Sequence, residues 1–418
     1  MTEQTDVDNS TIDDDETTNK NKWEVWGLVV GSSLISTGLA AYEIVPASVI
    51  PVIRESLHSG PTATGLIVSI MFGTAVIASL PVGAILDRTN TRSVMGIAVL
   101  TLMVAGIWGW VGGQNGNYWS VIGSRALGGI AYVIVWNAGI DIVGRSVDSS
   151  QQATAVGMFT ASGPIGFALG QGLGPIITAW FGWPAIFIAF NSLALIGLLL
   201  FWPTSNGLGY SAGSAPTLRE FGSVLQNRSV WLVGGLGFLG YSLYLFVNSW
   251  GSSYLTESVG LSLELSGLLV ALFPAVGILA RMSSGPLSDR LFRGQRRPVV
   301  LGSFFIAAPL VISFTHLRSV VTLIAILLIS GFAIQLTLGL SFTYVRELVD
   351  PRVAATAVAF QTSVGLAGAF LAPTAGGAIV DAAGFDTAFF VAGCLAVIGV
   401  GVAWQAPEPG NEICISDQ

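Results

Sequence analysis

Residues 153–189, ATAVGMFTASGPIGFALGQGLGPIITAWFGWPAIFIA, are matched 202 residues later by residues 355–391, ATAVAFQTSVGLAGAFLAPTAGGAIVDAAGFDTAFFV. The two stretches align without a gap. Identical pairs include Ala153/Ala355, Thr154/Thr356, Gly163/Gly365, Gly166/Gly368, Gly174/Gly376, Gly182/Gly384 and Phe187/Phe389. The same offset pairs Gly83 with Gly285 in an earlier part of each half, which indicates duplication of one unit rather than chance. The chain is therefore expected to fold as two equivalent halves.

The composition places this repeat in a membrane. Of the 418 residues, 52% are hydrophobic and 10% are charged, and the mean hydropathy is +0.72. Soluble proteins carry about 25% charged residues. The apolar residues occur in runs of roughly 20, the length of a membrane-spanning helix, and not in the short alternating segments of a membrane barrel. The predicted fold class is an all-α integral membrane protein with twelve transmembrane helices in two six-helix pseudo-symmetric bundles. The spans are expected at residues 25–50, 62–84, 93–112, 118–142, 152–178, 184–203, 229–254, 265–287, 298–316, 319–343, 354–380 and 386–405.

The positions of the basic residues predict the orientation of the chain. Thirteen of the seventeen lysines and arginines fall on the side of the spans that carries both termini. The positive-inside rule places this side in the cytoplasm, so we expect a multi-pass protein of the cell membrane with both termini cytoplasmic. The expected parts are an acidic disordered cytoplasmic tail at 1–22, an N-terminal bundle at 23–203, a cytoplasmic linker at 204–228, a C-terminal bundle at 229–405 and a cytoplasmic tail at 406–418.

Several classes of function lack the residues that they would need. The two cysteines, Cys394 and Cys414, provide neither a disulfide framework nor a metal cluster. The sequence contains no G-x-x-x-x-G-K-[ST] loop for ATP and no basic face for nucleic acid. We therefore expect no enzyme activity, cofactor or metal, and a monomer whose partners are a small molecule, protons and the lipid bilayer. Two lysines against fifteen arginines fit a halophilic source or, equally, a GC-rich coding bias.

Small residues at intervals of four predict where helices cross closely. Gly166, Gly170 and Gly174 follow this spacing in the fifth span. In the eleventh span the corresponding residues are Gly368, Ala372 and Gly376. Because such spacing leaves bare backbone on one face, a neighbouring helix is expected to approach closely at both places.

Three ionisable side chains fall deep inside the predicted spans, where a charge is costly unless it is paired or faces water. Glu43 and Arg125 both lie roughly 10 Å below the outer ends of their helices, so the two side chains could pair. The pair could be a static salt bridge, or Glu43 could carry the coupled proton while Arg125 modulates its affinity. Both interpretations stay open.

Arg281 differs because no carboxylate occupies a comparable depth elsewhere in the sequence. An unpaired guanidinium that faces a cavity can bind a carboxylate or oxyanion through two parallel hydrogen bonds. The alternative is that the side chain extends to the inner interface over roughly 12 Å.

Polar and aromatic residues in phase with these charges are expected to line the substrate site, although aromatic stripes can also be simple packing. The predicted substrate-binding residues are Arg281, Arg125, Tyr132, Trp136, Asn137, Tyr241, Tyr244, Asn248, Gln335 and Gln361.

Two loops carry a motif found in a known family. Residues 83–92 read GAILDRTNTR, and residues 285–290 read GPLSDR at the equivalent position of the second half. These stretches, with RALGG at 125–129 and YEIVP at 42–46, resemble the major facilitator superfamily, whose signature is G-x-x-x-D-R-x-G-x-R. Asn90 stands where that signature has Gly. The resemblance covers residues 23–405.

The resemblance implies a secondary active transporter that works by alternating access, with the two loops as gates. The residues that it marks for gating are Gly83, Asp87, Arg88, Arg92, Asp141, Gly285, Asp289 and Arg290. Asp141 is expected to join Arg88 or Arg92. The segment GILAR at 277–281 is similar to a span of anion-carrying members, which implies a proton-coupled symporter for a small, monocarboxylate-like organic anion. The alternatives are efflux of hydrophobic or cationic compounds through Glu43, and a membrane sensor that does not transport.

Overall fold

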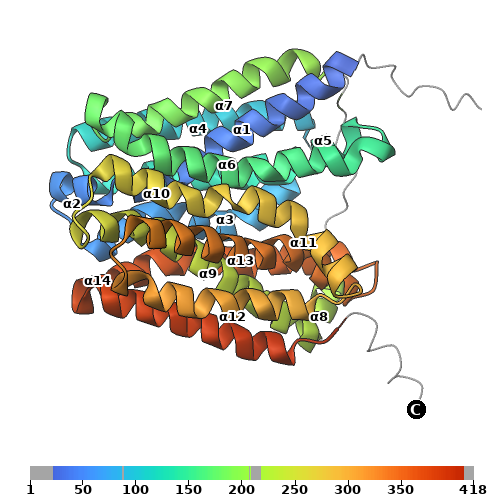
Figure 1. Cartoon of the computed structure of the whole chain (residues 1–418). Coiled ribbons are helices and arrows are strands. Elements are labelled where there is room, and N and C mark those ends of the chain that lie inside the picture. The colour runs from blue at the N-terminus through green and yellow to red at the C-terminus, as the bar shows by residue number, and fades with distance from the viewer. Residues whose placement is uncertain (1–21, 87–88, 207, 209–217, 409–418) are drawn as a thin grey trace, which may run out of the picture.

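The computed structural model describes residues 22–86, 89–206, 208 and 218–408, and these form a bundle of long helices that run nearly parallel to one another (Figure 1). The first half contains α1 (Lys22–Ser48), α2 (Ile50–Leu57), α3 (Pro61–Leu86), α4 (Thr91–Gln114), α5 (Tyr118–Ser146), α6 (Ser149–Phe181) and α7 (Ala185–Thr204). The second half contains α8 (Leu218–Gln226), α9 (Arg228–Glu257), α10 (Leu263–Ala275), α11 (Gly277–Leu291), α12 (Arg297–Ser313), the 3-10 helix η1 (Phe314–His316), α13 (Val320–Glu347) and α14 (Ala354–Gln405).

Within the described residues, eleven helical segments are long and apolar enough to cross a membrane. One of them, Leu263–Leu291, joins α10 and α11 across Val276 and forms a single span. Another is the 52-residue α14, which turns at Gly384 (φ 81°, ψ 175°) and supplies two spans. The twelve predicted spans are therefore confirmed. The short helices α2 and α8 were not predicted from the sequence.

Polar side chains fix where several spans begin. Asn117 accepts a hydrogen bond from the backbone N–H of Ser120 at 3.0 Å, ahead of α5. Asn227 does the same for Ser229 at 2.8 Å, ahead of α9. Such caps satisfy backbone N–H groups that have no partner inside the helix, so the polar clusters between apolar runs mark the true helix starts.

Glycines let helices of one half lie directly against each other. A Cβ at Gly166 of α6 would lie 2.5 Å from the carbonyl oxygen of Thr37 in α1. A Cβ at Gly368 of α14 would overlap the carbonyl oxygen of Phe238 in α9. Any larger residue would push these helices apart, so the close crossings predicted from the spacing of small residues are confirmed.

The two halves touch along α3 with α14 and along α6 with α10, with a smaller contact between α1 and α9. α1 begins and α14 ends at one end of the bundle, on the right of Figure 1, whereas α2 lies at the opposite end. We call these the termini end and the α2 end.

Candidate functional site

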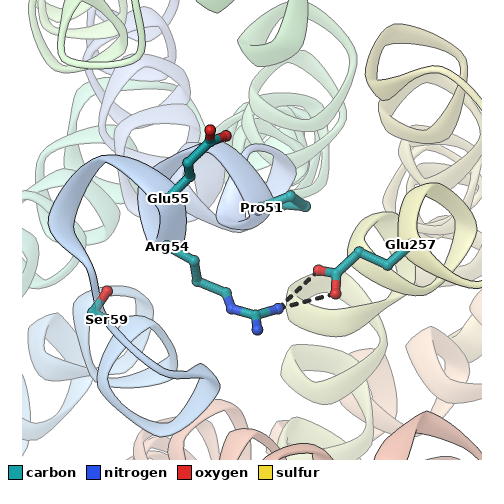
Figure 2. Close-up of a pocket in the computed structure, with 5 residues that line it drawn as sticks. All are labelled: Pro51, Arg54, Glu55, Ser59 and Glu257. Carbon is teal, nitrogen blue, oxygen red and sulfur yellow. Dashed lines mark hydrogen bonds and ion pairs between the residues drawn. The ribbon is translucent and has the colours of Figure 1, made fainter.

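At the α2 end, an ion pair connects the two halves. Arg54 of α2 donates from Nη1 to both carboxylate oxygens of Glu257, the last residue of α9, at 2.9 and 3.0 Å (Figure 2). The pair borders a pocket of about 360 Å³ that is also lined by Pro51, Glu55 and Ser59. Both side chains keep about a third of their surface exposed, so this contact lies at the rim and not in the core.

Below this rim, further polar contacts hold the halves together. The hydroxyls of Ser69 and Thr374 lie 2.8 Å apart between α3 and α14. Gln171 of α6 donates from Nε2 to the carbonyl oxygen of Asn248 in α9 at 2.6 Å. All of these residues belong to the parts of their helices nearest α2, so the α2 end is closed in this structure.

Arg125 of α5 binds main-chain oxygens of two neighbouring helices. Its Nη1 donates to the Tyr42 carbonyl at 2.6 Å, its Nη2 to the Glu43 carbonyl at 2.5 Å, and its Nε to the Ile67 carbonyl at 3.0 Å. The guanidinium is fully buried and lies over the Tyr42 ring, 4.8 Å from its centroid. Arg125 therefore ties α5 to α1 and α3.

The sequence explains why these oxygens need a partner. Pro46 lies inside α1 and has no N–H, so the carbonyl of Tyr42, four residues earlier, has no helical donor. A buried carbonyl without a donor is costly, and Arg125 supplies one. The expected proximity of Glu43 and Arg125 is thus observed, but the hydrogen bond goes to the Glu43 main chain and not to its carboxylate.

The Glu43 carboxylate itself is buried, with 3% of the residue exposed. Within the described residues, it takes part in no hydrogen bond or ion pair. This leaves the proton-binding interpretation open, because a carboxylate without a fixed partner can be neutral or charged.

Arg281 of α11 has one hydrogen-bond partner among the described residues. Its Nε donates to Oε1 of Gln335 in α13 at 2.9 Å. Its Nη1 lies 3.8 Å from the place where a Cβ of Gly163 would stand, next to the Trp136 ring, and so reaches across to the first half. The ion pairs of the described residues do not include Arg281. The terminal nitrogens of Arg281 are therefore available to an anion.

Arg281 meets Gln335 of α13 and lies beside Gly163 together with Trp136 of α5, whose ring neighbours that of Tyr132. The structure thus brings together predicted residues from α5, α11 and α13. Trp136 Nε1 is buried without a hydrogen-bond partner in the described structure. Since buried polar atoms are normally hydrogen-bonded, such an atom beside an unpaired charge favours a place for ligand or water.

The other predicted binding residues form no hydrogen bond with Arg281 in the described structure. The Asn248 side chain donates back to the Tyr244 carbonyl at 2.8 Å within α9. Gln361 packs against Gly237, between α14 and α9 of the second half. Asn137 is exposed. Their roles in binding stay predictions.

At the termini end of the first half, the predicted gate is seen only in part, because Asp87 and Arg88 lie outside the described residues. Gly83 has open space at its Cβ position. Arg92 donates to the Trp202 carbonyl at 3.0 Å and lies over the Trp202 ring. Asp141 pairs with Arg145 at 2.5 Å instead of with Arg92, because Arg145 lies one helical turn away on the same face.

The equivalent loop of the second half uses a residue that the sequence analysis did not select. Arg296 pairs with Asp289 at 2.6 Å and with Glu347 of α13 at 2.8 Å, which raises the pKa of its guanidinium above the usual range. Its backbone N–H donates to Glu408 at 3.0 Å, and burial raises the pKa of that carboxyl despite this bond. Arg290, the predicted gating residue, is exposed. The sequence did contain a sign of this role. The final arginine of the motif, Arg92, follows Asp87 by five positions, whereas Arg296 follows Asp289 by seven, so the second loop is two residues longer.

Comparison with known proteins adds an independent line of support. Over 381 residues, the chain is 24% identical to the probable L-galactonate transporter of Escherichia coli strain K12, covering 83% of this chain and 81% of that protein. Over 270 residues, it is 26% identical to the membrane sensor protein UhpC of the same organism, covering 57% of this chain and 58% of that protein.

Among solved structures, a bacterial homolog to the human lysosomal transporter Spinster, in an inward-facing and occupied conformation, has a similar fold. The TM-score is 0.77 with 17% sequence identity, and the match covers 92% of this chain and 97% of that one. A family model described as Major Facilitator Superfamily matches residues 30–373, most of the chain. The chain therefore belongs to the major facilitator superfamily of membrane transport proteins.

Proposed function

We propose that this protein carries a small organic anion across the cell membrane by alternating access, coupled to protons, as a monomer with both termini in the cytoplasm. The observation that carries the proposal is Arg281, whose terminal nitrogens lie between the two halves without a carboxylate partner among the described residues. The similarity to a probable L-galactonate transporter supports the same substrate class, since galactonate is a monocarboxylate.

The charge of the site favours monoanions. One guanidinium can bind one carboxylate through two parallel hydrogen bonds. A second negative charge would enter a low-dielectric environment without a partner, which is unfavourable. The aromatic side chains of Tyr132, Trp136 and Tyr241 provide the apolar part of the site around the carboxylate.

For proton coupling we propose Glu43 as the proton site, because its buried carboxylate has no hydrogen bond or ion pair among the described residues. An ionised Glu43 disfavours the entry of an anion into the same low-dielectric interior. A protonated Glu43 does not, so proton binding and anion binding favour each other. This linkage is the thermodynamic requirement for symport.

Because the α2 end is closed, we expect the substrate site to open toward the termini end. If the termini end is cytoplasmic, as the basic residues indicate, this conformation receives or releases substrate on the cytoplasmic side. The similar Spinster homolog is in an inward-facing conformation, which supports this assignment. The complementary state would open the contacts of Arg54, Ser69 and Gln171.

The test is uptake into proteoliposomes that contain the purified protein. L-galactonate, a simple monocarboxylate, a dicarboxylate and a lipophilic cation are offered with and without an inward acid gradient. We expect accumulation of a monoanion that depends on the gradient. Transport of the cation alone would favour the efflux carrier.

A membrane sensor is the second candidate because of the similarity to UhpC. A sensor would bind an anion without moving it. Binding of a monoanion in detergent, together with no flux in either direction in proteoliposomes, would support this function over transport.

A further inference from the structure

The span that carries Arg281 is broken one turn before it. α10 ends at Ala275 after Pro274, and α11 begins at Gly277. The side chain of Gln335 packs directly on Gly277, because a Cβ at Gly277 would overlap the Gln335 amide. Only glycine at position 277 leaves room for this amide, so Gly277 forms a slot for one buried side chain.

The amide in this slot determines how the Arg281 guanidinium is turned. Gln335 is fully buried, and its Oε1 accepts the hydrogen bond from Arg281 Nε at 2.9 Å. Because the guanidinium is planar, fixing Nε in this way sets the plane of the whole group and the direction of its terminal nitrogens. One of them, Nη1, points toward Gly163 and Trp136 of the first half.

We propose that Gln335 is a positioning residue for anion recognition, held by the slot at Gly277 and presenting the paired Nη1 and Nη2 groups of Arg281 to the carboxylate of the substrate. The inference rests on the proposed function, since it names what orients the anion-binding group. Gln335 does not bind the anion itself, because its Nε2 is buried in the slot.

The first half also contains a buried amide that packs directly on a glycine. It orients no charged group, so it provides a matched control. The Asn191 amide of α7 fits over Gly106 of α4, where a Cβ would overlap it. This amide donates to the Leu102 carbonyl at 2.5 Å, so it holds two helices together and orients no charged group. Asn191→Leu and Gln335→Leu therefore remove comparable buried amides.

The experiment measures binding of L-galactonate to the purified full-length protein by its tryptophan fluorescence, together with thermal unfolding. In Gln335→Leu and Gly277→Ala we expect the affinity to fall about tenfold or more, as for loss of a hydrogen bond to a charged group. In Gln335→Glu we expect a loss of at least about a hundredfold, because the new carboxylate neutralises Arg281 without changing the size of the side chain. Asn191→Leu should lower the unfolding temperature but keep the affinity.

A second measurement does not depend on the substrate. Phenylglyoxal modifies accessible guanidinium groups, and the rate at Arg281 is followed by peptide mass spectrometry. In Gln335→Glu the rate should fall about tenfold, since Arg281 gains a carboxylate partner. An unchanged rate would overturn the positioning role whatever the protein transports. A reduced rate with no anion bound or transported by the wild-type protein would support the contact between position 335 and Arg281 but overturn the proposed function and, with it, a role in anion recognition.

Discussion

Two arginines lie inside the membrane-spanning part of this molecule, one in each half, and they have opposite surroundings. Arg125 is fully buried, and each of its three nitrogens donates to a main-chain carbonyl. Arg281 donates from Nε to Gln335 and keeps its terminal nitrogens free among the described residues. A buried arginine is therefore not a ligand site by virtue of its charge alone. What matters is whether the fold already occupies its donors.

The difference comes from backbone chemistry. In α1, Pro46 leaves the Tyr42 carbonyl without a donor, and Arg125 fills that need. In the span of Arg281, the side chain of Gln335 fits against Gly277 and accepts the hydrogen bond from Nε of the arginine. This arrangement leaves the terminal nitrogens of Arg281 free among the described residues, so mutations can test the two sites separately.

The largest effect is expected at Arg125. Replacing it by Leu leaves the buried Tyr42 carbonyl without a donor, at about 1–3 kcal/mol, and also removes the hydrogen bonds to the Glu43 and Ile67 carbonyls, so the unfolding temperature should be sharply lowered. Arg125→Lys should rescue little, because an ammonium lacks the fork that reaches three oxygens. Thermal unfolding in detergent is the measurement.

A double variant tests the cause. Adding Pro46→Ala to Arg125→Leu provides an N–H for the Tyr42 carbonyl and should recover about 1 kcal/mol of stability. An unfolding temperature in Arg125→Leu equal to that of the wild-type protein would contradict the structural role and make Arg125 a candidate anion ligand again.

Replacing Arg281 should abolish anion binding while the protein still folds. Arg281→Ala is expected to bind no anion, since the anion proposal rests on this guanidinium alone, and to lower the unfolding temperature less than Arg125→Leu, since it removes one hydrogen bond instead of three. Arg281→Lys keeps the charge and loses the planar fork, so affinity should fall without vanishing. Unchanged affinity of Arg281→Ala for L-galactonate, measured by fluorescence, would remove the anion proposal and favour efflux.

A variant of Glu43 tests whether its carboxylate, which lies near Arg125, carries the proton. Glu43→Gln should abolish accumulation driven by a pH gradient but retain exchange of labelled substrate for unlabelled substrate across proteoliposomes. The amide has the shape of the protonated acid, so the binding site should stay intact. Accumulation that still follows the gradient would reduce Glu43 to a structural residue of α1.

The fold could be predicted from the sequence because it depends on the order and length of segments along the chain. Runs of apolar residues set the number of spans, and the offset between residues 153–189 and 355–391 set the division into halves. Short helices such as α2 were missed, because eight residues next to a longer apolar run give no signal of their own.

The sequence predicted candidate residues for the site, but not which atoms those residues contact. Glu43 and Arg281 stood out as charges in apolar spans, and the structure shows that neither forms an ion pair among the described residues. The partners of Arg125 are main-chain oxygens, which no residue type reveals, although Pro46 was a clue. The slot at Gly277 depends on the fit of one glycine to one side chain, and only the packed structure shows it.

The smallest effect is expected at the ion pair of Arg54 and Glu257, which joins the halves at the exposed α2 end. Partly exposed pairs contribute about 0–1 kcal/mol, so Arg54→Glu should change the ratio of α2-end-open to α2-end-closed molecules by no more than about fivefold. The measurement is the distance distribution between spin labels at His58→Cys and Ser258→Cys, with Cys394 and Cys414 replaced by Ala. Reversing the pair, Arg54→Glu with Glu257→Arg, should restore the wild-type distribution, and high salt should reproduce the effect of the single variant. A shift in Arg54→Glu that the reversed pair fails to correct would show that Arg54 acts through contacts other than Glu257. A much larger shift would mean that an arginine at the rim controls the conformation more strongly than its exposure suggests.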